Sequence, residues 1–434
     1  MISQRSTRRC WPLVLLLLTA GAQADEYSFD MSQFEKKRFE LGGYVQLEQQ
    51  DFSLNRAGAL YKLGYNGEPQ LDSLGQTTEI LDLTGKIREG IGTFDFHTYS
   101  QLQQNQVAND QNNKFYEAAF SLRPTPGVTL EAGKRALSWG NGYAFNPIGF
   151  VQRPKDPNDP LLAREGYVMA DGDFIWNPGG ALQTVAFTPV LMPVGAQVNN
   201  DFGASGHLNP AFKVYALYRN TDFDFAWQGK GSRPGRFGMD FARNLTTNFE
   251  IHGEWATILQ FAQPVTDAAG HTTTEVANAT SYLLGLRYLT ESNTTYIAEY
   301  YRNGTGYSQT EADQFYQLVD TTFTQLQQIG SSPLLQKALA LGQGPYGKPF
   351  AGEDYLYFRA QQQDALGIVY FQPAVFAMVN LDDHSFQVTP ELLYTGIKNL
   401  ELRLRLYMLH GGSFTDFGEK PNSHTLELYA RYYF

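Results

Sequence analysis

Polar and apolar residues alternate singly along most of the chain, and the alternation is clearest over residues 425–434. One face of this segment carries Leu426, Leu428, Ala430, Tyr432 and Phe434, and the other carries Thr425, Glu427, Tyr429, Arg431 and Tyr433. Successive side chains of a strand point to opposite faces, so the segment predicts a β-strand with one apolar and one polar face. Residues 400–409 repeat the pattern, with Leu at alternate positions and Arg403 and Arg405 between them. Charged residues opposite Leu indicate a wall between lipid and water.

Segments of this kind recur from residue 39 onward and total about eighteen, with sixteen as the alternative. A strand of about ten residues crosses a bilayer when it is tilted. Short polar turns alternate with longer connections, as in transmembrane barrels. A sheet in hydrocarbon must close on itself, because each unpaired backbone group costs several kcal/mol. The pattern therefore predicts an all-β fold, a closed antiparallel transmembrane β-barrel with long external loops.

Two of the predicted external loops carry local signals. Loop 137–165 is punctuated by Gly140, Gly142 and several prolines, which favour a defined path because glycine permits positive φ and proline fixes it. Loop 303–362 has apolar residues at helical spacing, so we expect helical content there, either packed on neighbouring loops or capping the mouth. A strand over Gln363–Phe371 should follow it. Residues 259–279 are expected to form another external loop.

The N-terminus has the order of a secretory signal peptide. Arg5, Arg8 and Arg9 precede an apolar stretch over residues 11–20, and a small-x-small sequence ends at Ala24. We expect removal of residues 1–24, which leaves 25–434 as one exported barrel domain. The single cysteine, Cys10, lies within the predicted signal. The mature chain should therefore have no disulfide and no cysteine-bound metal.

Composition narrows the function classes. The chain has 33 Lys and Arg against 44 Asp and Glu, a net charge of −11, and no basic stripe, which excludes nucleic acid as a partner. The mean hydropathy is −0.35, and no internal apolar run reaches the roughly 18 residues of a membrane helix, which excludes multi-helix membrane proteins. The seven histidines are scattered. We expect no metal, no cofactor and no enzymatic activity.

The signal peptide, the amphipathic strands and the final Tyr429-Ala-Arg-Tyr-Tyr-Phe434 together carry a resemblance. The chain resembles Gram-negative outer-membrane β-barrel proteins over its whole predicted mature length. Within that class, its strand number is similar to that of eighteen-stranded substrate-selective porins and alginate-export type channels. The resemblance implies outer-membrane lipids as surroundings and recognition of the last strand, ending at Phe434, by the barrel-assembly machinery.

In porins the third external loop folds into the lumen, and by strand order loop 137–165 is the third. A mixed-charge constriction is therefore predicted, with a structured surface loop of self-satisfied ion pairs as the alternative. The candidate constriction residues are Arg135, Asn141, Asn146, Arg153, Lys155, Asp156, Asp159, Arg164 and Glu165. Strand alternation also predicts a charged lumen lining that includes Lys213, Glu254, Arg287, Glu299, Glu391, Arg403, Arg405 and Arg431.

These features favour an outer-membrane channel that lets small hydrophilic solutes diffuse passively or selectively. A non-conducting barrel used for adhesion, assembly or scaffolding is the first alternative. A barrel hydrolase is the second, since His252 shares a predicted face with Glu250 and Glu254. Both signs of charge alternate around the predicted lumen, so the pattern does not indicate which solute passes.

Overall fold

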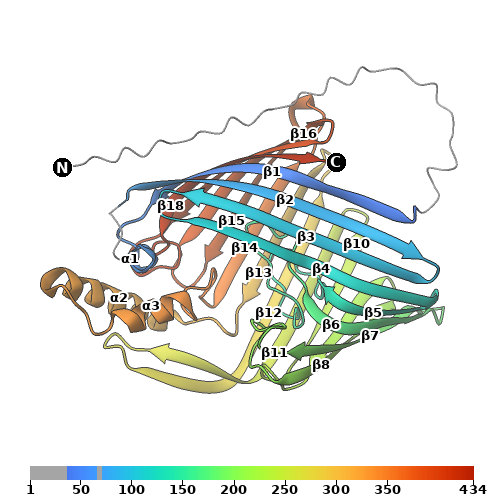
Figure 1. Cartoon of the computed structure of the whole chain (residues 1–434), viewed down its shortest axis with the longest axis horizontal. Helices are drawn as coiled ribbons and strands as arrows, with labels where there is room; N and C mark the ends of the chain where they lie inside the picture. The colour runs from blue at the N-terminus through green and yellow to red at the C-terminus, as the bar shows by residue number, and fades with distance from the viewer. Residues whose placement is uncertain (1–36, 66–70) are drawn as a thin grey trace, which may run out of the picture. The chain divides into compact units, whose positions relative to one another are not determined.

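The computed structural model describes residues 37–65 and 71–434. The predicted signal peptide, residues 1–24, lies outside the described residues. Over the described part, eighteen strands form one antiparallel sheet, which closes where β1 (Phe39–Leu54) pairs with β18 (Asn422–Tyr433) (Figure 1). The predicted closed barrel and its strand number of eighteen are confirmed, and the alternative of sixteen is wrong.

The other strands follow one another around the barrel in sequence order. They are β2 (Ser73–Glu89), β3 (Gly92–Asn105), β4 (Asn109–Thr125), β5 (Val128–Arg135), β6 (Tyr167–Trp176), β7 (Leu182–Val194), β8 (His207–Tyr218), β9 (Thr221–Gln228), β10 (Arg236–Thr246), β11 (Phe249–Thr266), β12 (Thr272–Leu289), β13 (Thr294–Arg302), β14 (Asp354–Gln362), β15 (Phe371–Asn380), β16 (Phe386–Ile397) and β17 (Leu400–His410). The even number places the start of β1 and the end of β18 at one end, with short turns such as the one between β2 and β3. We call this the short-turn end, and the opposite one the long-loop end.

Exposure along the strands is the reverse of that in a soluble protein. In β18, Leu428 is 53% exposed on the outer face, whereas Glu427 on the inner face is 6% exposed. Neighbouring β17 exposes Leu404 and buries Arg405 in the same way. Water would favour the opposite arrangement, because exposing apolar side chains and burying charges both cost free energy. The outer face therefore matches a hydrocarbon surrounding.

The strand predicted at Gln363–Phe371 is wrong. The fourteenth strand is Asp354–Gln362, which pairs with β13 and β15. Residues 363–370 instead form the turn to β15, where Asp364 and Leu366 have positive φ and Leu366 is 87% exposed. The apolar residues of this turn resemble the pattern of a strand. The mixed sequence of residues 354–362 gives no clear alternation, so the strand there was not recognised. The preceding loop accordingly ends at 353 and not at 362.

That loop contains the predicted helices. α2 (Gln309–Ile329) starts with a capping box between Ser308 and Glu311 and ends at Gly330, whose φ is 72°. α3 (Leu335–Gln343) follows, and a short helix, α1 (Ala59–Gly64), lies in the β1–β2 loop. Buried residues of all three helices share one apolar cluster. Among the described residues, no helix is long and apolar enough to span a membrane.

The loop predicted over residues 259–279 is also wrong. β11 and β12 continue as a long hairpin to Thr266 and Thr272, with a bulge between Ile258 and Phe261. Gln260 has a φ of 49° in the bulge, and its backbone N–H donates to Asn278 Oδ1 at 3.0 Å. The strands stay paired on both sides of the bulge. The apolar alternation breaks at this point, and for that reason the sequence predicted a loop.

Candidate functional site

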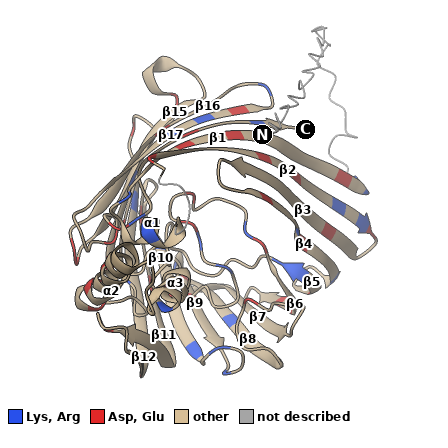
Figure 2. Ribbon diagram, turned by 60° about the vertical axis from the view of Figure 1, so that its left-hand side comes forward, with Lys and Arg blue, Asp and Glu red and all other residues tan. Residues whose placement is uncertain are grey.

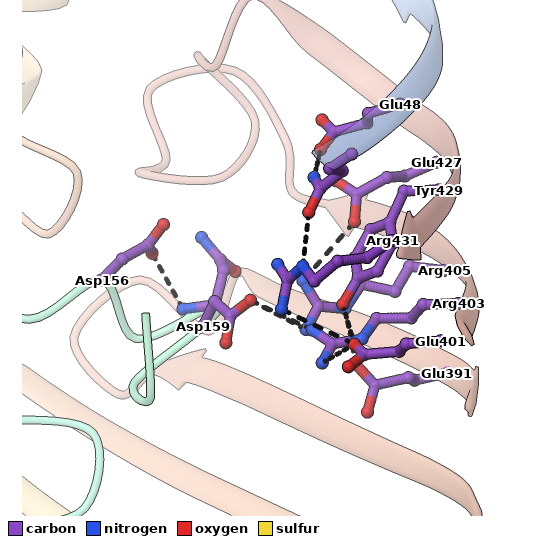
Figure 3. Close-up of polar contacts among 12 residues, drawn as sticks. Glu48, Asp156, Asp159, Glu391, Glu401, Arg403, Arg405, Glu427, Tyr429 and Arg431 are labelled. Carbon is purple, nitrogen blue, oxygen red and sulfur yellow. Dashed lines mark hydrogen bonds and ion pairs between the residues drawn. The ribbon is translucent and has the colours of Figure 1, made fainter. Parts of the chain in front are cut away.

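Residues 136–166, which connect β5 to β6, bind the inner side of the barrel wall far from their own strands. We call this segment the inner loop. Its side chains and backbone contact inward-facing residues of β10, β11 and β13, and also of β16 and β17. Figure 3 shows its Asp156–Asp159 stretch facing the arginines of β17. Contacts on both sides of the ring of strands require the loop to run inside the barrel.

Two buried glutamates hold the loop backbone. Glu254 of β11 accepts the Gly142 N–H at 2.6 Å and the Ile148 N–H at 3.2 Å, together with the Asn146 amide at 3.1 Å. Carboxylates bind convergent backbone N–H groups strongly, because each is a charge-assisted hydrogen bond. These contacts fix the route of the loop without any requirement for particular loop side chains, except at Asn146.

Glu299 of β13 is the second anchor, and it is 0% exposed. It accepts the backbone N–H groups of Tyr143 and Ala144, the latter at 2.8 Å, and contacts His252 Nε2 at 2.9 Å. Nearby, the Asn141 amide donates to Asp240 of β10 at 2.7 Å. Glu254 and Glu299, predicted as free lumen lining, therefore serve to hold the inner loop.

Apolar packing reinforces this path. Trp139, Ile148 and Phe150 join the cluster formed by inward residues of β6 to β9 and β11. Ala144 and Phe145 join a second cluster with inward residues of β12 to β15. The apolar residues of the inner loop therefore cover much of the inner wall between β6 and β15.

The second polar attachment is at β17. Asp159 Oδ2 accepts from Arg403 at 3.1 Å and from Arg405 at 3.2 Å (Figure 3). Asn158 Oδ1 accepts from Gln387 of β16 at 2.6 Å. The structure thus brings Asp159 together with Arg403, Arg405 and Glu391, as a mixed-charge contact between loop and wall.

We call the charged residues of this wall the paired wall. They are Arg359, Glu391, Glu401, Arg403, Arg405, Glu427 and Arg431. Arg405 contacts Glu391 at 2.5 Å and Glu427 at 3.5 Å, and Arg359 contacts Glu391 at 2.9 Å. Arg403 contacts Glu401 at 3.2 Å, and Arg431 lies 3.8 Å from the same carboxylate. Every arginine of the paired wall thus has a carboxylate partner.

The other charges predicted for the constriction lie at the base of the loop. Arg153 contacts Glu165 at 3.5 Å and also pairs with Asp201, while Glu165 binds Lys134 at 2.5 Å and Lys114 at 3.1 Å. These ion pairs fasten the loop to β4, β5 and the β7–β8 connection. Here the interpretation as self-satisfied ion pairs fits better than a charged constriction.

Lys155 and Arg164 bind neutral carbonyls of the loop itself. Lys155 Nζ donates to Gly142 O at 2.5 Å and Tyr143 O at 3.1 Å, and Arg164 donates to Arg153 O at 2.9 Å. Burial lowers the pKa of Lys155, and the negative charges of Glu254 and Glu299 only partly offset this effect. Burial raises the pKa of Glu165, but the hydrogen bonds from Lys134 and Lys114 outweigh it, and the net pKa lies below the usual value.

The remaining predicted residues are spread along the wall. Arg135 pairs with Glu131 of its own strand and with Asp171 of β6, and Lys213 pairs with Asp224 at 3.1 Å. Arg287 faces the lumen and, over the described residues, makes no ion pair within 4.0 Å. Arg135 and Lys213 are thus paired within the wall, whereas Arg287 borders a cavity next to Tyr143 and Leu161 of the inner loop.

The inner loop borders two cavities. One, of about 550 Å³, lies between Asp156 and Asn158 of the loop and inward residues of β16 to β18, with Phe350 and Phe417 above. The other, of about 350 Å³, is lined by Tyr143 and Leu161 of the loop together with Arg287 and Arg359. No group of three or more metal-ligating side chains occurs within residues 37–65 and 71–434.

Sequence reasoning missed several members of the site. Arg359 was missed because its strand was placed nine residues too late, and correct alternation over 354–362 would have found it. Gln387 is an inward residue of a correctly identified strand, but an uncharged amide gave no signal. Asp201 binds the loop from the β7–β8 connection, and Lys134 binds Glu165 at the base of the β5–β6 pair.

No protein-family model and no curated protein matches the chain. Among solved structures, Pseudomonas aeruginosa OpdQ has a TM-score of 0.51 at 9% identity, covering 92% of this chain and 99% of that one. Pseudomonas aeruginosa OccK5 (OpdH) has a TM-score of 0.49 at 11% identity, covering 90% and 97%. A mutant of the Rh. blastica porin has a TM-score of 0.44 at 11% identity, covering 91% of this chain and 100% of that one. At such identities, the likeness to OpdQ establishes the barrel fold alone.

Proposed function

We propose that the protein is an outer-membrane channel of the porin type, through which small hydrophilic solutes diffuse passively. The inner loop is its constriction. The observation that carries the proposal is the attachment of this loop to both sides of the inner wall, through Glu254 and Glu299 and through Asp159. A loop held in this way narrows the lumen to the space beside the paired wall.

The outward Leu and aromatic residues support a position in the outer membrane, reached by way of a cleaved signal peptide. Lipids are then the partner of the outer face, and the assembly machinery reads the last strand up to Phe434. Along the passage, charges of both signs are paired with each other, so no ring of one sign selects counter-ions. Solutes need no cofactor, because they move down their gradient.

The deciding experiment is the conductance of the purified protein in planar bilayers, compared with a variant lacking residues 141–158. We expect discrete channels and a larger single-channel conductance after the deletion. An unchanged conductance would exclude the inner loop as the constriction. A protein that inserts but never conducts would instead favour the scaffolding alternative.

The hydrolase alternative lacks supporting geometry within the described residues. His252 contacts Glu299 at 2.9 Å and Glu250 at 3.5 Å. No hydroxyl or thiol within that part of the chain hydrogen-bonds to the ring, so a nucleophile is not activated there. We therefore propose that the protein is not an enzyme.

A further inference from the structure

A cavity of about 700 Å³ opens at the long-loop end, where β9 and β10 finish and the taller β11–β12 hairpin rises beside them. Three cations line it, Lys230, Arg233 and Arg236, and Lys348 of the β13–β14 loop lies close enough to Arg233 for the two charges to repel. We call these four residues the rim cluster.

The cations of the rim cluster are held in place without a direct ion pair, and the Asp201 carboxylate acts on Arg233 only from a longer distance. Arg233 rests on the Phe202 ring, 4.0 Å from its centroid, and donates to the Phe202 carbonyl. Arg236 lies 5.8 Å from the Phe150 ring centroid. Throughout the described chain, no carboxylate comes within 4.0 Å of a nitrogen of any of the four. Burial lowers the pKa of Lys348, and the Arg233 charge lowers it further, as expected where cations gather without a counter-charge.

Unsatisfied polar atoms line the same cavity. Gln228 is 0% exposed, and neither its amide nitrogen nor its oxygen has a hydrogen-bond partner. The Nε of Arg236, its cross-strand neighbour, also has none. Buried polar groups without partners cost free energy, so native proteins rarely leave two side by side. This arrangement indicates a place for a ligand that accepts hydrogen bonds.

The outer lip of the cavity is apolar. Trp227 and Leu259 are exposed on the outer face, and Trp227 stacks with Phe212, their ring centroids 5.4 Å apart. Phe237 contacts Trp255 at 5.5 Å on the same face. Aromatic side chains gather at the level of lipid headgroups, because one part of the ring is apolar and another is wet. The rim cluster therefore lies just beyond the aromatic band.

We propose that this rim cavity binds the phosphate headgroup of a lipid in the surrounding leaflet. The inference rests on the proposed function, because it needs the outer face to lie in a membrane. A phosphomonoester carries a charge of about −1.5 to −2 and three acceptor oxygens, which suits several convergent cations better than one carboxylate does. The acyl chains of the lipid would lie along Trp227 and Leu259, while Gln228 Nε2 and Arg236 Nε would donate hydrogen bonds to the phosphate oxygens.

The test is calorimetric titration of the full-length protein in non-ionic detergent with dihexanoyl phosphatidic acid. Dihexanoyl phosphatidylcholine and inorganic phosphate are titrated in parallel. We expect phosphatidic acid to bind at least about ten-fold more tightly than either of the others. Lys230→Gln and Arg236→Gln should each lower its affinity on the order of ten-fold, because each removes one charge-assisted contact. The exposed Lys398→Gln, at the short-turn end, is the matched control and should leave the affinity unchanged.

Equal binding of both lipids, or unchanged affinity in both rim variants, would overturn the inference. If inorganic phosphate bound as tightly as phosphatidic acid, a lipid would be excluded as the source of the phosphate. Lys230 is exposed, so Lys230→Gln should fold even if Arg236→Gln does not. Single-channel conductance measured on the same samples keeps the two proposals apart. A barrel that binds phosphatidic acid without conducting would contradict only the proposed function.

Discussion

The paired wall and the rim cluster are both rich in basic side chains, yet they differ in what surrounds the charge. In the paired wall, Arg405 is within 3.5 Å of the carboxylates of Glu391, Asp159 and Glu427. In the rim cluster, Arg233 and Arg236 lie against aromatic rings, Arg233 donates to a backbone carbonyl, and the Asp201 carboxylate acts on Arg233 without a direct ion pair. Cations neutralised within the chain hold elements together, whereas cations left without an anion are available to a ligand.

Removing a cation should therefore lower the free energy of unfolding far more in the paired wall than in the rim cluster. Arg405→Gln would leave Glu427 of β18 without its arginine and would take from Glu391 of β16 one of its two close arginines, at a cost of about 3–5 kcal/mol in the free energy of unfolding. Urea unfolding in lipid vesicles, followed by tryptophan fluorescence, measures this cost. Arg236→Gln strands no carboxylate and should cost under about 1 kcal/mol. Equal losses in the two variants would break the comparison.

The contact of the inner loop with the paired wall depends on Asp159. Asp159→Asn removes the charge that Arg403 and Arg405 share, so the loop should be held less firmly by about 1–3 kcal/mol. The two arginines would then lack one counter-charge, and the reversal potential in a salt gradient should shift towards anion permeation. Asp156→Asn, three residues away, is the control, because Asp156 is exposed and accepts only the Asn158 N–H at 2.9 Å. A shift in the control as large as that in Asp159→Asn would argue against a specific contact.

The alternation along the strands was sufficient to predict the barrel and the inward direction of the arginines of β17 and β18. Their partners were predictable only in part. Glu427 and Arg405 lie on neighbouring strands, so pairing within the wall follows from the register once the strands are known. Asp159 meets Arg403 and Arg405 across the lumen, over 240 positions away in sequence, and no local pattern indicates that contact.

The rim cluster was not predicted for a related reason. Lys230, Arg233 and Arg236 stand close together in the sequence, but a short basic hairpin is usually solvated and paired. Its lack of carboxylate partners depends on Asp201 being taken by Arg153, which only the folded loops determine. The roles of Glu254 and Glu299 were missed for the same reason. Both accept backbone N–H groups, which every residue type except proline has, so the sequence of the loop gives no sign of these contacts.

Paired charges also hold the base of the inner loop, and acidification should weaken this attachment. The pKa of Glu165 is held below its usual value by Lys134 and Lys114. Its stabilising effect is therefore complete above the ordinary pKa of about 4.5 and is lost as the pH falls through the lowered value. We expect proteolysis within residues 136–166 to accelerate below about pH 4.5.

Glu165→Gln should remove this acid dependence, with the loop already more sensitive to protease at neutral pH. Glu89→Gln serves as the control, because its ion pair with Arg38 is largely exposed and distant from the loop. An acid response that persists in Glu165→Gln would assign the effect to another group.

The smallest effect on stability is expected for a substitution in the rim cluster. Lys348→Gln relieves the repulsion from Arg233, so the free energy of unfolding should stay within about 0.5 kcal/mol of the parent or rise slightly. Added salt should stabilise the parent more than the variant, because salt screens like charges. Urea unfolding at low and high ionic strength measures both. A clear loss of stability in Lys348→Gln would mean that this cation has a stabilising partner.

The inner loop is fastened largely by its main chain, since the N–H groups of Gly142, Tyr143, Ala144 and Ile148 all end on two glutamates of the wall. Main-chain amides are common to nearly every residue type. Mutations at the exposed side chains of the loop can therefore change the profile of the passage while its course stays the same, whereas Gly140, Gly142 and the buried apolar residues are constrained. A laboratory selection for new permeants should accumulate changes at the loop side chains and leave Glu254 and Glu299 untouched.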